Sequence, residues 1–371
     1  MARPAMLGAV GAGAAALMLT ACASNSASAP KPTSPAAASV SGTSSSASSG
    51  GGTILPGEPD VNGDGKVTIG VLSPGDINDH GYYESFVDAA ETYAKQKGWT
   101  VIKRGSVPTS DALNAARALC QQHVDMVALG ASELKDAIPA SEEPACAKTA
   151  WYVPESNNIQ QTPKIFLSTD DPTQDMLAAG YAAGLLMQGK GYTKAAFVAG
   201  IKADFSVTAA AAFQAGIREV VPSGTLVSTY TGDFNDSAKA KEATQAMLSQ
   251  GVKVVYPYLG GATDASASLA NGSGALTLTP GTDRCDSTSP KFDISVIFSP
   301  GDYFLAALEK FAAGQLAMGV TRVWQIGVDP YPTVKLCTGT AEQKQKMATF
   351  ISDIGKKKIN PAAEVKRLGG S

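Results

Sequence analysis

Short apolar segments rich in β-branched residues alternate with helical segments along most of this chain. The segment 66–72 reads KVTIGVL, and the segment 82–97 that follows it places Phe86, Ala90 and Tyr93 on one helical stripe. Nearly continuous apolar strands that are separated by amphipathic helices indicate parallel sheets covered on both faces. The chain is therefore expected to adopt an α/β fold of parallel sheets flanked by helices.

The expected elements form two successive runs of strands and helices, which predict two lobes. Strands are expected at 66–72, 100–103, 126–129, 164–168, 194–199, 225–230, 252–258, 275–279 and 294–298. Helices are expected at 82–97, 111–122, 175–188, 206–219, 236–250 and 301–318. The first lobe is expected to span 66–173, with about 300–325 returning to it, and the second to span 174–299 with part of 326–371.

The first residues are typical of an export signal. A single Arg3 precedes an apolar run at 7–19, which is too short to span a bilayer. The sequence LTAC at 19–22 resembles the bacterial lipobox, which predicts cleavage after a signal peptide of residues 1–21 and lipidation of Cys22. Attached acyl chains would anchor the protein stably at the extracytoplasmic face of the cell membrane. An ordinary secretory signal that is cut beside Ala21 is the alternative.

The residues after Cys22 have the composition of a linker. Ser, Ala, Pro, Thr and Gly dominate much of 22–65, so this stretch is expected to be a disordered lipoprotein linker. Its end, 60–65, reads DVNGDG and resembles the start of a calcium-binding loop. The twelfth position is Val71 instead of the glutamate that such a loop requires. We therefore expect a polar turn, with a calcium site as the alternative.

The cysteines fit an oxidising compartment. Of the five cysteines, those other than Cys22 form an even set, and we expect the disulfides Cys120–Cys146 and Cys285–Cys337. Two free buried thiols are the alternative. The two histidines lack ligand-spaced neighbours, so no metal site and no cofactor are expected. The formal net charge of −3 provides no basic footprint for nucleic acid.

The loop after the first strand carries candidate binding groups. In open α/β sheets ligands lie beyond the carboxyl ends of the strands. Here Asp76, Asn78 and Asp79 offer hydrogen-bonding groups, and Tyr82 and Tyr83 offer rings that can stack on a flat ligand. Capping of the following helix by Asn78 or Asp79 is the alternative.

This loop also carries a family resemblance. Residues 73–85, SPGDINDHGYYES, resemble the F-N-D-x-G-(aromatic)-x-(Gln/Glu)-S motif of the basic membrane protein family, the purine nucleoside receptor type of ABC-transporter solute-binding lipoproteins. Further segments resemble that family in its own order, namely KIFLSTDD at 164–171, AGYAAGLL at 179–186, TKAAFVAG at 193–200, FQAGI at 213–217, DFNDS at 233–237 and GVKVVYPYLGG at 251–261. The resemblance implies a class-I-like periplasmic-binding-protein fold, a small-molecule ligand and an ABC permease as partner.

The resemblance also implies roles for individual residues. Tyr82 and Phe234 would stack on a purine, Asn78 and Asp79 would hydrogen-bond the base, and Asp170 would contact the ligand where the lobes join. Gly260 or Gly261 would let the backbone approach the ligand. The alternatives are structural: Phe234 as a packing residue at a helix entry, the glycines as a turn, and Asp170 as a helix cap.

The second half departs from the family pattern. The family has an I-G-V-D strand end whose acid binds ribose, and later an S-x-x-K. The matching segments here are ALTLTP at 275–280 and SVIFSPGD at 295–302, which lack both the acid and the lysine. The sequence IGVD does occur at 326–329, but after the helix expected at 301–318. The ligand is therefore expected to be nucleoside-like or another solute.

The sequence carries no sign of catalysis. It has no nucleophile elbow, phosphate loop or metal-ligand spacing, so we expect a binding protein and not an enzyme. The favoured function is a monomeric, lipid-anchored solute-binding protein of an ABC importer. The alternative is a receptor or envelope lipoprotein that keeps this fold and binds a protein partner.

Overall fold

The computed structural model describes residues 56–79, 81–155 and 159–369. The predicted signal peptide, the lipidation site Cys22 and the linker up to residue 55 lie outside these residues. Within the described ranges, no helix combines the length and the apolar character that crossing a membrane requires.

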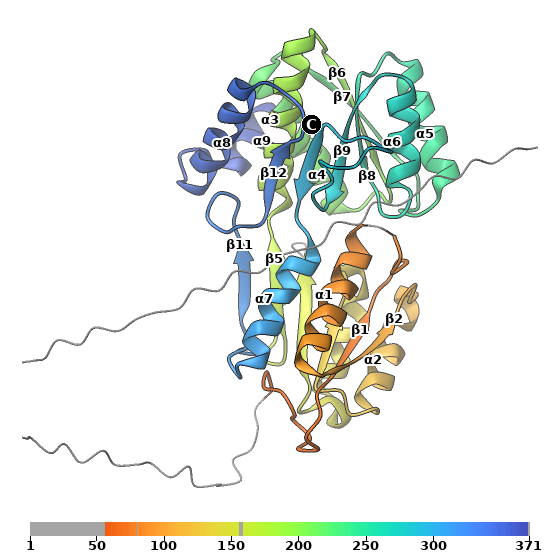
Figure 1. The fold of residues 1–371 in the computed structure, drawn as a ribbon, viewed down its shortest axis with the longest axis vertical. Helices are drawn as coiled ribbons and strands as arrows, with labels where there is room; N and C mark the ends of the chain where they lie inside the picture. Colours follow the sequence, from red (N-terminus) through yellow and green to blue (C-terminus); the bar gives the residue numbers. More distant parts are fainter. Residues whose placement is uncertain (1–55, 80, 156–158, 370–371) are drawn as a thin grey trace, which may run out of the picture. The chain divides into compact units, whose positions relative to one another are not determined.

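The described strands form two six-stranded sheets, drawn in Figure 1. The strands of the first sheet are β1 (Thr68–Leu72), β2 (Thr100–Arg104), β3 (Met126–Leu129), β4 (Ala150–Glu155), β5 (Phe166–Asp170) and β11 (Thr321–Trp324). Their order is β11-β5-β4-β3-β1-β2, and every neighbouring pair is parallel. The parallel pairing brings the carboxyl ends of these strands to one edge of the sheet.

The second sheet repeats this arrangement with one reversed strand at its edge. Its strands are β6 (Lys194–Ala199), β7 (Thr225–Tyr230), β8 (Val254–Tyr258), β9 (Leu276–Gly281), β10 (Ile294–Ile297) and β12 (Thr333–Leu336). The order is β12-β10-β9-β8-β6-β7, with β12 antiparallel to β10 and the other pairs parallel. The sheets therefore share one topology along five of six strands.

Helices cover both faces of each sheet, as Figure 1 shows. The described helices are α1 (Tyr82–Lys97), α2 (Ala112–Cys120), α3 (Pro172–Lys190), α4 (Asp204–Val220), α5 (Ser237–Ser249), α6 (Thr263–Gly272), α7 (Pro300–Ala312), α8 (Ala341–Gly355) and α9 (Pro361–Leu368), together with the 3-10 helices η1 (Thr109–Asp111), η2 (Ser132–Glu142) and η3 (Pro144–Cys146). The expected α/β fold of parallel sheets flanked by helices is confirmed.

Side chains of each strand alternate between the cores on the two faces. In β3, Met126 and Ala128 pack with Phe86 of α1 on one face, while Val127 and Leu129 pack toward α2 and η2 on the other. The second sheet follows the same rule, with α3, α4 and α8 on one face and α5 and α6 on the other. Burial on both faces explains why β3 is apolar at every position.

The chain passes between the sheets at several points. It leaves the first sheet after β5 to enter α3, returns after β10 to enter α7, and leaves again after β11 to enter β12. Helix α7 packs on the first sheet through Phe304 and Phe311, although the strand before it belongs to the second sheet. These passages place the starts of α3 and α7 at the strand ends of both sheets.

Several elements were not expected from the sequence. Strand β4 contains Pro154, which argues against a central strand because proline cannot donate to the ladder. Strands β11 and β12 have only four residues each. Helix α7 was expected to continue to residue 318 but ends at Ala312, because Gly314 adopts a left-handed φ of 65°.

Helices α3 and α4 contact each other closely through glycines. A Cβ atom on Gly216 would lie 2.1 Å from the carbonyl oxygen of Leu177, and one on Gly180 would lie 2.0 Å from that of Phe213. Both contacts involve backbone atoms, which cannot move without separating the helices. The small residues at 179–186 and 213–217 therefore form one tightly packed helix pair.

Replacing Gly216 by alanine is expected to lower the free energy of unfolding by about 2–3 kcal/mol, because the added methyl group overpacks the helix pair. Gly272 provides a matched control, since a Cβ atom there meets nothing within 4 Å. Gly272→Ala should leave the stability unchanged or raise it by about 0.4–1 kcal/mol. Urea unfolding measures both changes, and equal stabilities of the two variants would contradict the packing described.

The end of the predicted linker packs against the first sheet. Val61 is buried, and its backbone N–H donates to Asp125, whose other carboxylate oxygen accepts from Thr68 in β1. The carboxylate of Asp60 accepts from the backbone N–H of Gly65, so it closes a turn. Residues 57–65 thus form a polar turn with one apolar anchor, in front of β1.

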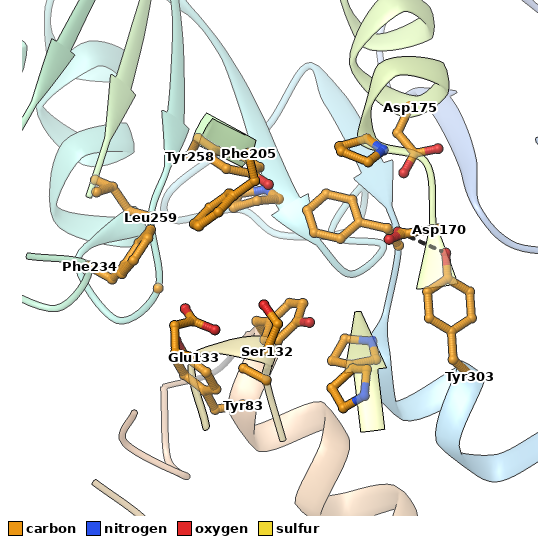
Figure 2. A pocket seen from close by; sticks show the side chains of 18 of the residues that line it. Tyr83, Ser132, Glu133, Asp170, Asp175, Phe205, Phe234, Tyr258, Leu259 and Tyr303 are labelled. Atoms are coloured by element: carbon orange, nitrogen blue, oxygen red, sulfur yellow. Dashed lines mark hydrogen bonds between the residues drawn. The ribbon is translucent and has the colours of Figure 1, made fainter. Parts of the chain in front are cut away.

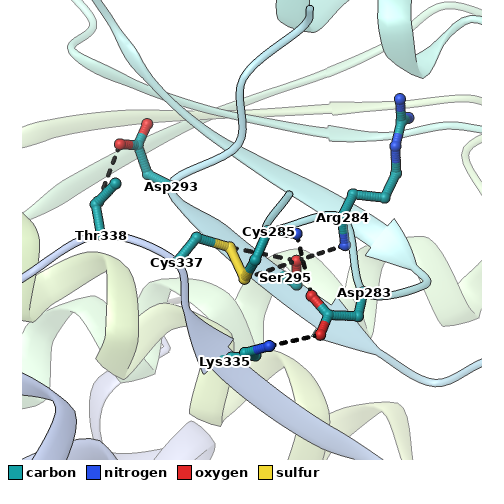
Figure 3. Close-up of a disulfide and its surroundings, with 8 residues drawn as sticks. All are labelled: Asp283, Arg284, Cys285, Asp293, Ser295, Lys335, Cys337 and Thr338. Atoms are coloured by element: carbon teal, nitrogen blue, oxygen red, sulfur yellow. Dashed lines mark hydrogen bonds and ion pairs between the residues drawn. A yellow bond between two sulfur atoms is a disulfide. The ribbon is translucent and has the colours of Figure 1, made fainter. Parts of the chain in front are cut away.

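The structure confirms both predicted disulfides. Cys120–Cys146 joins the end of α2 to η3, with a Cα–Cα distance of 5.1 Å. Cys285–Cys337 joins the chain after β9 to the chain after β12, with a Cα–Cα distance of 4.9 Å (Figure 3). The hydroxyl of Ser295 in β10 contacts both sulfur atoms of this second disulfide. The bond therefore ties the loop after β9 to the end of β12, the antiparallel edge strand of the second sheet.

Candidate ligand-binding site

The carboxyl ends of strands from both sheets converge on one cavity of about 130 Å³ (Figure 2). This is close to the engineered cavity of about 150 Å³ that admits one benzene ring. Its position agrees with the general rule that ligands of open α/β sheets lie beyond the carboxyl ends of the strands. The lining residues are Tyr82, Tyr83, Ala131, Ser132, Glu133, Pro154, Ser168, Asp170, Pro172, Asp175, Met176, Phe205, Phe234, Tyr258, Leu259, Gly260, Pro280, Phe298, Pro300 and Tyr303.

Aromatic side chains from both sheets line the cavity. Phe205, in the first turn of α4, stacks nearly parallel to Phe234, with ring centroids 6.4 Å apart and an interplanar angle of 16°. Phe298 lies between Tyr82 and Tyr258, at centroid distances of 6.3 and 6.2 Å. These rings come from elements far apart in the sequence, and they offer flat faces to a ring-bearing ligand.

Phe234 is held in place by glycines of neighbouring loops. A Cβ atom on Gly200, at the end of β6, would lie 2.4 Å from the Phe234 ring, so only glycine leaves room for it. The carbonyl oxygen of Phe234 accepts from the backbone N–H groups of Gly260 and Ala262. Gly261 donates to the side chain of Asn235 and does not line the cavity. Of the predicted glycines, Gly260 alone is among the described lining residues.

The predicted polar residues of the first loop are engaged in local structure. The carboxylate of Asp76 accepts from the backbone and side-chain nitrogens of Asn78, and both residues are exposed outside the cavity. The carboxylate of Asp79 accepts from the N–H groups of Gly81, Tyr83 and Glu84 at the start of α1. Asp79 thus satisfies the helix N-terminus, which was the structural alternative for this residue.

Two carboxyl groups lie together where the chain enters α3. The hydroxyl of Tyr303 donates to Asp170 at 3.4 Å, drawn as the dashed line in Figure 2. Asp175 lies in the first turn of α3, is 2% exposed, and its Oδ1 has no hydrogen-bond partner. The neighbouring Asp171 accepts from the N–H of Thr173 and acts as the N-cap of the helix. Asp170 and Asp175 therefore face the cavity, whereas Asp171 serves the helix.

Burial determines the charges of this acidic pair. Burial raises the pKa of Asp170 to about 6, against hydrogen bonds from its own backbone, Asp175 and Tyr303. Burial also raises the pKa of Asp175 well above its ordinary value, and the charges of Asp170 and Asp171 raise it further. Because both pKa values are raised and the two groups repel each other when both are charged, the pair retains a proton more readily than two free carboxyl groups.

The ligand-free protein is expected to become more stable by about 1–3 kcal/mol as the pH falls from 7 to 5. The raised pKa of Asp170 means that the folded state binds more protons than the unfolded chain across this range, which stabilises it as the pH falls. In the double variant Asp170→Asn/Asp175→Asn, this increase in the free energy of unfolding between pH 7 and pH 5 should be markedly smaller. Urea unfolding at both pH values measures it, and an equal gain in the two proteins would contradict these assignments.

Several lining residues were missed from the sequence. Glu133 begins η2 just after β3, Phe205 begins α4 just after β6, and Tyr303 lies in the first turn of α7. Each follows the carboxyl end of a strand, which is the signal that could have identified them. Burial raises the pKa of Glu133, as expected for a carboxyl group in an apolar wall.

The segments that depart from the family pattern also reach the site. Thr279, where the family resemblance places an acid, is buried in β9 and is not among the lining residues, while its neighbour Pro280 lines the cavity. Ser299 caps α7, because its hydroxyl accepts from the N–H of Asp302. Asp329 of the IGVD segment accepts from Arg322 and from the backbone of Gln325, and it is not among the lining residues.

Solved structures share the fold of this chain. A solute-binding protein of an ABC transporter system from Conexibacter woesei DSM 14684 is 18% identical, with a TM-score of 0.63 over 79% of this chain and 98% of that chain. One from Aeropyrum pernix K1 is 16% identical, with a TM-score of 0.64 over 82% and 90%. A periplasmic solute-binding protein from Actinobacillus succinogenes 130z with bound D-allose is 15% identical, with a TM-score of 0.59 over 76% and 100%. At such identities the likeness shows the fold alone.

The family is shown by the sequence itself. No curated protein has significant similarity to the chain. Residues 66–368 match the Bmp family model, described as ABC transporter substrate-binding protein PnrA-like. This range includes both sheets, every described helix and the cavity. The chain therefore belongs to the Bmp family of PnrA-like ABC transporter substrate-binding proteins.

Proposed function

We propose that this protein is the extracytoplasmic, lipid-anchored substrate-binding protein of an ABC importer, and that it captures a small ring-bearing solute. The observation that carries the proposal is the cavity at which strand ends of both sheets converge, lined by aromatic rings and by a carboxyl oxygen without a partner. Such a lining holds a small molecule by ring contacts and a few directed hydrogen bonds. The D-allose bound in the Actinobacillus succinogenes protein is consistent with small-solute capture by this fold.

A nucleoside-like ligand is the first candidate. Tyr82 and Phe234, which the family resemblance assigns to purine stacking, both line the cavity. Asp170 lines it as well, while Asn78 does not, so the polar edge of a base would meet the acidic pair. Thr279, which the family resemblance aligns with the ribose-binding acid, carries no carboxylate and is not among the lining residues. Nucleosides, free bases and sugars therefore all belong in the first panel of ligands.

The proposed mechanism is capture without chemistry. The two lobes, 66–173 with about 300–325 and 174–299 with part of 326–371, would close over the solute by bending at the passages after β5, β10 and β11. The lipid on Cys22 and the linker would hold the monomeric protein near its permease. The permease would then accept the solute from the closed form.

A thermal-shift panel on the full-length protein in detergent tests this function. A true ligand at about a hundredfold its Kd should raise the Tm by roughly 5 °C, because binding then adds about 2.7 kcal/mol of stability. Recovery of the ligand chemically unchanged distinguishes capture from turnover. Consumption of the ligand would establish an enzyme, and the absence of stabilisation by every solute would favour the protein-binding receptor.

A further inference from the structure

The lining of the cavity is acidic without a basic counterpart. Glu133, Asp170 and Asp175 line it, and the described lining residues include no Lys, Arg or His. Figure 2 shows Asp170 and Asp175 together beside Tyr303, and Glu133 apart from them beside Ser132 and Tyr83. A negatively charged ligand would therefore meet repulsion from more than one direction.

The unpartnered oxygen of Asp175 indicates a missing donor. Asp175 is 2% exposed and its Oδ1 accepts no hydrogen bond in the ligand-free structure. Buried polar atoms are nearly always paired, because leaving one unpaired costs about 1–3 kcal/mol. The bond that Asp170 accepts from Tyr303 is long, at 3.4 Å. The pair therefore has acceptor capacity that a donor on the ligand can use.

The other lining groups do not suit a ligand rich in hydroxyl groups. The described lining includes no Asn, Gln or Arg, whose amide or guanidinium groups can offer two hydrogen-bonding atoms at once to neighbouring sugar hydroxyls. The hydroxyl of Ser168 already accepts from the indole N–H of Trp324. Apart from the carboxyl groups and the serine and tyrosine hydroxyls, the lining consists of ring faces and aliphatic groups. Ring faces carry partial negative charge and attract cations.

We propose that the ligand is a small organic cation, whose charged nitrogen lies against Asp170 and Asp175 and whose apolar body lies among the aromatic side chains. The nitrogen would be that of an amine or a quaternary ammonium group. This inference rests on the proposed function, because it names the ligand class of the same cavity. Aromatic rings and a carboxylate acting together are a recurrent means of binding ammonium groups.

Matched probes of one size test this ligand class on the full-length protein in detergent. Benzylamine and benzyltrimethylammonium are cations, benzyl alcohol is neutral, and benzoate is an anion. We expect calorimetry or ligand-observed NMR to show each cation binding at least tenfold more tightly than benzyl alcohol, with no binding of benzoate. Inosine and D-ribose are measured in the same series.

Variants connect the charge preference to the acidic pair. Asp170→Asn/Asp175→Asn should weaken binding of both cations at least tenfold and change the affinity for benzyl alcohol by a much smaller factor. Asp171→Asn is the matched control, since it also removes a carboxylate at the start of α3 but replaces an N-cap with another good one. It should change the affinity for the cations by less than about threefold.

Two outcomes would overturn the inference. One is equal affinity for benzylamine and benzyl alcohol, and the other is a failure of both cations to bind. If inosine or D-ribose binds in either case, the proposed capture function stands and only the ligand class is wrong. If no solute of the series or of the thermal-shift panel binds, the proposed function fails with it.

Discussion

Replacing Cys285 and Cys337 together by alanine is expected to lower the free energy of unfolding by about 4 kcal/mol and to weaken ligand binding. The disulfide closes a loop of 52 residues, and its loss increases the entropy of the unfolded chain. It also constrains the chain that follows Pro280, a lining residue of the cavity. Urea unfolding and ligand titration, both under non-reducing conditions, measure the two effects.

The Cys120–Cys146 disulfide provides the matched control. Its loop spans 26 residues, so the corresponding double alanine variant should lose about 3.5 kcal/mol. The bond lies at the end of α2 and in η3, away from the lining residues. Ligand affinity should therefore stay unchanged in this variant. Equal losses of affinity in the two variants would show that binding follows overall stability instead of the geometry of the loop after β9.

Replacing Tyr82 and Phe234 together by alanine is expected to reduce affinity for the natural ligand by roughly thirtyfold to a thousandfold, because each ring contributes about 1–2 kcal/mol of contact. Both rings line the cavity; Tyr82 begins α1, after β1 of the first sheet, and Phe234 lies between β7 of the second sheet and α5. Isothermal titration calorimetry measures the loss.

Phe350→Ala provides the control for losing an aromatic contact elsewhere. Phe350 stacks on Tyr181 at a centroid distance of 3.9 Å, and neither residue lines the cavity. This variant should lose stability by about 3–5 kcal/mol and keep its affinity in the folded protein. A double variant at Tyr82 and Phe234 that binds as tightly as the wild type would place the ligand outside this cavity.

The fold was largely predictable because its strands are buried on both faces. Segments such as 126–129 and 195–199 are apolar at every position, and each lies in the interior of a sheet. Strand β4 escaped prediction because Pro154 interrupts it, yet its neighbours β3 and β5 hold it in the sheet. Pairing with β3 and β5, and not the local sequence pattern, therefore determines that this segment is a strand.

The site was predictable only in part. Tyr82, Asp170 and Phe234 were identified from local motifs and do line the cavity. In the sequence Asp76 and Asn78 were equally good candidates for ligand binding. In the structure they lie in one turn, where the carboxylate of Asp76 accepts hydrogen bonds from Asn78.

Asp175 was missed because its local sequence suggests a structural role. It lies in the first turn of α3, where an acid normally serves the helix N-terminus. Here Asp171 provides the cap, and Asp175 faces the cavity without a partner for its Oδ1. Which acid serves the helix depends on how the chain leaves β5, and this cannot be read from the residue types alone.

Native mass spectrometry of the full-length protein, purified without denaturation, tests the role as a solute-binding protein most directly. We expect one small molecule per chain in the wild type, carrying a ring and a basic nitrogen, and its loss from the double alanine variant of Tyr82 and Phe234. A wild-type protein that carries no small molecule, and that gains none from solutes of its growth medium, would contradict the capture function.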